Sequence, residues 1–123
     1  MKLWLTYLAF GIVLLSCKKK DDDVACTMEF RMVQIRVIGA PLEDYYTIRE
    51  STGDTLRHDS FSSGETEYYT VLDDNFQSVL KGKTETFRFV GIQNDLVVVN
   101  EPIVIRADAC HIEYVSGKLE VEL

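Results

Sequence analysis

Apolar and polar residues alternate along most of the chain after residue 28, which is typical of β-strands that bury one face. Clusters of Gly, Asn, Asp, Ser and Pro separate the alternating stretches, as turns do. The pattern predicts strands over residues 28–38, 45–50, 55–60, 67–72, 84–90, 96–99, 103–106, 112–115 and 119–123, with an uncertain short element over 76–80. About eight short strands predict an all-β fold, a single antiparallel β-sandwich over residues 26–123.

Three of these stretches carry irregularities. In the first, the apolar parity slips between Met32 and Val33, which predicts a β-bulge there or a strand that bends from one sheet to the other. The unbroken apolar run over 96–99 predicts a strand that is covered on both faces or paired centrally. Pro102 interrupts the chain next, so we expect the strand over 103–106 to start afresh or to lie at a sheet edge.

The same alternation predicts which faces are buried. Residues 112–115 and 119–123 flank a turn over 116–118 and predict a hairpin. In the strand over 84–90, the inward positions hold Phe87 and Phe89. In the final strand, the inward positions hold Leu119, Val121 and Leu123, while Glu120 and Glu122 point outward.

Residues 1–16 have a different pattern. Lys2 is the only charged residue before Lys18, and residues 3–15 are mostly apolar. This run is shorter than the 20 or so residues that a membrane span needs, and it fits the apolar region of a cleaved signal peptide. It ends in Leu14, Leu15, Ser16 and Cys17, which resembles the lipobox of bacterial lipoproteins. The resemblance implies cleavage before Cys17 and diacylglycerol on its sulfur; an ordinary secretory signal with a chance cysteine is the alternative.

A charged tether over residues 17–25 follows. Its charges cannot be buried, so we expect it to be solvated and unstructured. The run resembles the surface-export signal of lipoproteins from the Bacteroidota, here in Lys19, Lys20, Asp21, Asp22 and Asp23. This resemblance implies a protein anchored by lipid, including palmitate, on the outer face of the outer membrane. The alternatives are retention on the periplasmic face and an acidic run that is only a tether.

If Cys17 carries lipid, Cys26 and Cys110 remain as the only possible pair. A disulfide is chemically allowed outside the cytosol, and one that closes so long a loop contributes at most about 4.5 kcal/mol. It would join the N-terminal edge of the sandwich to the last hairpin. Two free thiols or a metal site are the alternatives. Adjacent strand residues such as Cys110 and His111 point to opposite faces, which argues against a zinc site.

The chain holds 20 acidic and 13 basic residues and has a formal net charge of −7. This balance excludes a nucleic-acid partner, which needs clustered basic residues, and it leaves a covalent lipid as the means of membrane attachment. Residues 73–75 lack the ligand spacing of a calcium loop. No nucleophile elbow or cleft-forming acid pair can be assigned among His58, Ser62, Ser63, Glu65 and Glu67. We therefore expect no catalytic residue, metal or cofactor.

Paired tyrosines at 45–46 and 68–69 point to opposite faces of their strands, so one of each pair can be exposed. We identify Tyr45 and Tyr68 as possible ligand-facing residues, because exposed tyrosines form flat platforms for sugars or peptides. The alternative is that all of them belong to the core or rim.

Residues 35–42, Gly64 and residues 68–71 resemble the transthyretin-like, carboxypeptidase-regulatory-type sandwiches found in Bacteroidota lipoproteins. Here Gly64 precedes Tyr68 by four residues where members show two. The resemblance implies a transthyretin-like or immunoglobulin-like sandwich with an accessory role.

The sequence thus predicts a lipid-anchored, non-catalytic binding or accessory module of the bacterial envelope. Its partner would be an unidentified protein or glycan. A structural or assembly subunit of an envelope complex is the first alternative, and a small hydrolase is the second.

Overall fold

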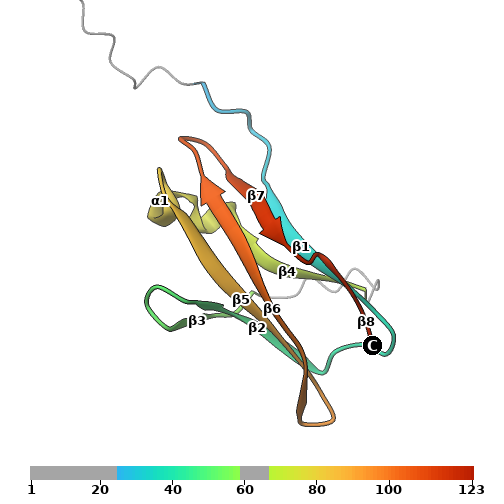
Figure 1. Ribbon diagram of the computed structural model, residues 1–123. Helices are drawn as coiled ribbons and strands as arrows, with labels where there is room; N and C mark the ends of the chain where they lie inside the picture. Colours follow the sequence, from blue (N-terminus) through green and yellow to red (C-terminus); the bar gives the residue numbers. More distant parts are fainter. Residues whose placement is uncertain (1–24, 59–66) are drawn as a thin grey trace, which may run out of the picture.

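Two facing β-sheets make up the computed structural model, which describes residues 25–58 and 67–123 (Figure 1). The three-stranded sheet has the order β4 (Tyr68–Asp73), β1 (Met32–Ile38) and β8 (Glu120–Glu122). The five-stranded sheet has the order β3 (Asp54–Leu56), β2 (Asp44–Arg49), β5 (Thr84–Gln93), β6 (Leu96–Ala107) and β7 (Ile112–Gly117). Between β4 and β5 lie a 3-10 turn, η2 (Asp74–Phe76), and a short helix, α1 (Gln77–Leu80). The predicted all-β sandwich is confirmed.

Several sequence predictions fall outside the described residues. These are the signal peptide, the lipid attachment at Cys17, the export signal and the residues Ser62, Ser63, Gly64 and Glu65. In the part of the chain that the structure describes, no helix is long and apolar enough to cross a membrane.

The core lies between the sheets and is built from the inward positions of both. Phe87 and Phe89 are fully buried, as the alternation predicted. Ile35 and Val71 face them from the three-stranded sheet and are equally buried. Each such side chain contributes about 1.5–3 kcal/mol through removal from water, so these positions hold the two sheets together.

The first strand begins at Met32, not at residue 28, and the predicted bulge at Met32–Val33 is wrong. The parity slip marks the point where the chain enters the sheet: Phe30 and Met32 are exposed, whereas Val33 is buried. The irregularity lies in the partner strand, where Val33 pairs with Leu72 and Gln34 pairs with Thr70. The extra residue, Val71, is therefore on β4, and it turns a second consecutive side chain toward the core.

Residues 96–107 form one strand, so the prediction of two separate strands is wrong. β6 pairs with β5 along its length, but it pairs with β7 only from Ile103 to Ala107. Pro102 immediately precedes Ile103, where the pairing of β6 with β7 begins, so its missing N–H removes no hydrogen bond to β7. The start of β6 is not covered on both faces either, because Leu96 and Val97 are 67% and 57% exposed.

The predicted C-terminal hairpin is also wrong. After β7 the chain crosses to the other sheet, where β8 pairs in parallel with residues 36–38 of β1. The crossing is fastened by a hydrogen bond from the Arg36 N–H to the Leu119 carbonyl at 2.8 Å. The predicted inward orientation is confirmed for Val121, which is buried. It is wrong for Leu123, which is 46% exposed.

Candidate functional site

A disulfide joins the N-terminal segment to the loop between β6 and β7. Cys26 and Cys110 form it, with their Cα atoms 5.3 Å apart, which confirms the predicted pair. The loop that it closes spans 84 residues, so the bond constrains the unfolded chain strongly, by up to about 4.5 kcal/mol in the chain-entropy model.

A polar cluster adjoins this disulfide. His111 is 6% exposed; its Nδ1 lies 2.7 Å from Oδ2 of Asp74 and its Nε2 lies 2.9 Å from Oγ1 of Thr27. Asp74 also accepts backbone N–H groups from Arg31 and Ile112, both at 2.8 Å. One carboxylate therefore contacts two segments that are distant from it in sequence, the entry to β1 and the start of β7.

The environment of Asp74 favours its ionised form. Burial alone would raise the pKa of this carboxyl, but the hydrogen bonds from Arg31, Ile112 and His111 outweigh burial and lower it. Nearby, backbone N–H groups of His111 and Cys110 lower the pKa of Asp108. We call Cys26, Thr27, Asp74, Cys110 and His111 the N-terminal latch, because together they hold the N-terminal segment against the sandwich.

The order Thr27, His111, Asp74 matches the nucleophile, base and acid of a catalytic triad. Sequence reasoning missed this arrangement, because nothing in the spacing of the three residues signals their proximity. The contacts of Asp74 also give it a structural role. Its two oxygens are occupied by backbone N–H groups that secure the start of β7 and the entry to β1.

A shallow groove of about 610 Å³ lies between the entry to β1 and strand β7. Its lining includes Phe30, Arg31, Met32, Glu113, Tyr114 and Leu119. Sequence reasoning did not identify this groove, because its two walls come from opposite ends of the chain. We call it the open-side groove.

Partial strand pairing creates the groove. β8 pairs only with residues 36–38 of β1, so the stretch from Met32 to Ile35 has β4 as its single strand partner among the described residues. β7 is the last strand of its sheet, and within the described parts of the chain it pairs only with β6. β1 and β7 also contact each other, so two incompletely paired strands meet at this side of the sandwich (Figure 1).

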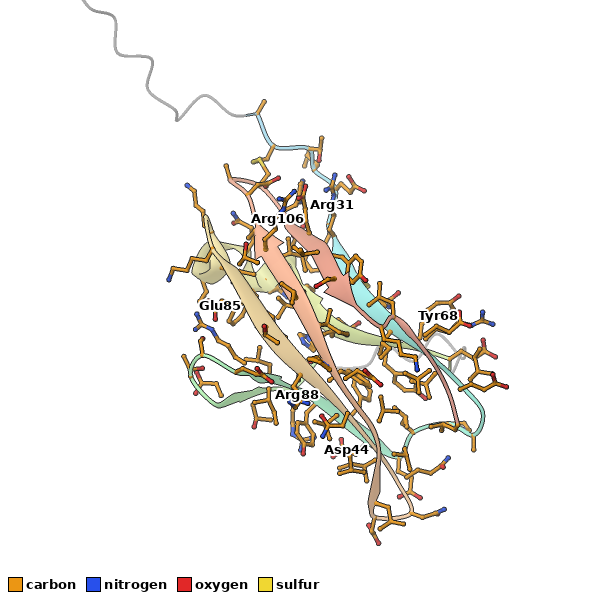
Figure 2. All side chains as sticks on the ribbon, viewed as in Figure 1. Arg31, Asp44, Tyr68, Glu85, Arg88 and Arg106 are labelled. Carbon is orange, nitrogen blue, oxygen red and sulfur yellow. A yellow bond between two sulfur atoms is a disulfide. The ribbon has the colours of Figure 1, made fainter. Side chains whose placement is uncertain are left out.

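The two tyrosines predicted to face a ligand do not share a surface. Tyr45 is half-buried and packs on the core, with ring centroids 4.9 Å from Tyr69 and 5.9 Å from Phe89. Tyr68 is 51% exposed, and the Arg36 guanidinium lies 5.8 Å from its ring centroid. Figure 2 shows Tyr68 well away from Arg31, which lines the groove. The structure therefore does not build a tyrosine platform from this pair.

The remaining polar candidates have structural contacts. Asp73 caps η2 by accepting the Asn75 N–H at 2.9 Å. His58 places Nε2 3.0 Å from the Val71 carbonyl oxygen. Glu67 pairs with Arg36 at 3.1 Å. Within residues 25–58 and 67–123, no group of three or more His, Cys, Asp or Glu side chains is arranged to hold a metal ion.

Comparison with known proteins adds no identity. No family model, no curated protein and no solved structure matches the chain.

Proposed function

We propose that this protein is a lipid-anchored, surface-displayed, non-catalytic binding module of the bacterial envelope. The observation that carries the proposal is the lipobox-like run ending at Cys17, followed by a short tether that leads into the N-terminal latch. The stretch from Cys17 to Cys26 reaches at most about 30 Å when extended, so an anchored sandwich would sit close to the lipid surface. The disulfide provides a covalent attachment at the point where the tether would pull.

The anchor is tested by Cys17→Ala in the intact chain. Labelled palmitate should no longer be incorporated, and the protein should leave the membrane fraction or fail to mature. Ser16→Ala, which keeps a small residue immediately before the cysteine, serves as a control for processing. Palmitate incorporation that is unchanged by Cys17→Ala would refute the anchor.

Surface display is tested separately. Replacing Asp21, Asp22 and Asp23 together with Ala should reduce cleavage of the protein by protease added to intact cells. Membrane attachment should remain, because Cys17 is untouched. Equal cleavage of the two proteins would show that the acidic run is only a tether.

The open-side groove favours an assembly subunit as the second candidate function. Incompletely paired strands are templates for a partner polypeptide, and a subunit of an envelope complex would use them for docking. Chemical cross-linking on intact cells distinguishes the two functions. A stable complex of fixed composition supports the assembly subunit, whereas reversible capture of a ligand supports the binding module.

Among the described residues, the arrangement that a hydrolase could use is Thr27 with His111 and Asp74. Wild-type protein and Thr27→Val should behave identically toward p-nitrophenyl acetate, with no acyl-enzyme burst in either. A burst that is present in the wild type and absent in Thr27→Val would show an acyl-transfer activity and contradict the proposed non-catalytic function.

A further inference from the structure

β7 is a longer edge strand than β3 and β8, and it equals the fourth edge strand, β4, in length. β3 is three residues long and begins with the charged Asp54. β8 is also three residues long, and it begins and ends with the charged residues Glu120 and Glu122. β7 has six residues, and its centre carries Tyr114 and Val115, each 45% exposed. Short length is one of the usual means of preventing strand addition, so β7, which carries the single charge of Glu113, is the edge of these three with the most room for a further strand.

The side chains beside this edge form an apolar surface. Phe30 is 54% exposed and Met32 is 47% exposed, and both line the open-side groove opposite Tyr114. Beneath them, Val33 and Ile112 connect the groove to the core. An extended segment added at β7 would direct every second side chain toward this surface, because side chains alternate along a strand.

The charges indicate which flanking residues the occupant needs. The groove is lined by two carboxylates, Glu29 and Glu113, and each is paired with a guanidinium, Arg31 at 3.5 Å and Arg106 at 2.7 Å. The attraction for a charged segment therefore comes from the molecule as a whole. The whole chain carries a net charge of −7. A segment with basic residues at its ends would be attracted to this molecule, whereas an acidic segment would be repelled.

We propose that the open-side groove binds an extended segment of a partner polypeptide, which adds as a strand at the free edge of β7. The segment is no longer than β7, whose first N–H, that of Ile112, already bonds to Asp74 at 2.8 Å. It has apolar residues at alternate positions and Lys or Arg at its ends. Main-chain hydrogen bonds to β7 supply affinity, and the groove reads the apolar side chains. A strand edge fits a polypeptide in preference to a glycan, because its donors and acceptors repeat at main-chain spacing. This inference rests on the proposed binding function and names its ligand class.

The test uses the full chain in nanodiscs and a phage-displayed library of random dodecapeptides. Selected peptides should show the alternating apolar pattern with basic ends, and their affinity is then measured by fluorescence anisotropy. Met32→Lys should weaken binding at least tenfold. Leu96→Lys is the matched control: Leu96 is 67% exposed at the start of β6, outside the groove, so this variant should bind as the wild type does.

A second measurement keeps the test independent of protein stability. N-methylation of alternate peptide bonds in a selected dodecapeptide should abolish binding in one register and spare it in the other, because only one edge of the added strand bonds to β7. Circular dichroism confirms that Met32→Lys remains folded.

Three results would overturn the inference. The first is a library that yields no peptide above background, and the second is a set of peptides that bind Met32→Lys as tightly as the wild type. The third is a dimer of the unliganded protein that Met32→Lys dissociates, because the occupant would then be a second copy of this chain. Palmitate labelling distinguishes these failures from failure of the anchor, since it does not depend on the groove.

Discussion

Removing the carboxylate of Glu85 should destabilise the fold in a pH-dependent way. Glu85 on β5 accepts hydrogen bonds from Arg49 on β2 at 2.7 and 2.9 Å, and it also contacts the hydroxyl of Ser51. The ion pair is well covered, because the side chains of Arg49 and Glu85 are 14% and 12% exposed. Phe76 of η2 covers Arg49, with the guanidinium 5.3 Å from the ring centroid.

The expected magnitude follows from the pKa. The hydrogen bond from Arg49, together with the Ser51 hydroxyl, lowers the pKa of Glu85 from 4.5 to about 2, against an opposing effect of burial. This lowering corresponds to about 3 kcal/mol of folding free energy. Because the folded-state pKa is depressed, the stabilisation is fully present above about pH 4.5 and is lost as pH falls toward 2. Glu85→Gln should therefore lower the free energy of unfolding by about 3 kcal/mol at pH 7 and by little near pH 2.

Urea unfolding of the two proteins at pH 7, 4.5 and 2.5, followed by far-UV circular dichroism, measures this difference. The matched control is Glu50→Gln. Glu50 follows the last residue of β2 and pairs with Arg88 of β5 at 2.8 Å, but both side chains are more than a third exposed. An exposed pair contributes about 0–1 kcal/mol, so this control should change little. Equal losses in Glu85→Gln and Glu50→Gln at pH 7, or a loss in Glu85→Gln that does not shrink at pH 2.5, would refute the reasoning.

Two further predictions concern other parts of the fold. Replacing Cys26 and Cys110 together with Ser should lower the free energy of unfolding by as much as about 4.5 kcal/mol, measured by urea unfolding. A double variant that keeps the stability of the disulfide-bonded protein, while the reduced and alkylated protein loses it, would contradict the entropy model. Gly117→Ala should lower the melting temperature, because Gly117 has φ of 116° and an added Cβ would lie 2.6 Å from the Pro102 carbonyl oxygen. Gly53→Ala on the β2–β3 turn is its control, since φ is also positive there (76°) but nothing lies within 4 Å of the added Cβ; equal losses in both would assign the effect to backbone strain alone.

The polarity pattern predicted the β-sandwich and its best-packed strand correctly. Phe87 and Phe89 are buried where alternation placed them, and the strands predicted over 45–50 and 55–60 correspond to β2 and the start of the hairpin partner β3. Alternation works there because a strand with one buried face has a two-residue period that the neighbouring strands do not alter. The assignment of Cys26 to Cys110 was likewise correct, although free thiols had remained open.

Strand neighbours could not be predicted in the same way. A hairpin and a crossing between sheets have the same local pattern, so the path from β7 to β8 was predicted as a hairpin, whereas β8 joins β1 in parallel. Pro102 was expected to break a strand, but it lies where β7 no longer pairs with β6. Which edge of a strand is unpaired depends on the lengths of its neighbours, and a single strand does not encode those lengths.

The sequence by itself determined the fold class and the buried phenylalanines, because these depend on local periodicity. It named Cys26 and Cys110 as a possible pair, and the structure decided between a disulfide and free thiols. It is also the sole source of the anchor prediction at Cys17, which lies outside the described residues. Tertiary structure alone decided that Thr27, Asp74 and His111 meet, and that Met32 and Tyr114 line one groove. Those residues are separated by long stretches of chain, and only the packing of two sheets brings them together.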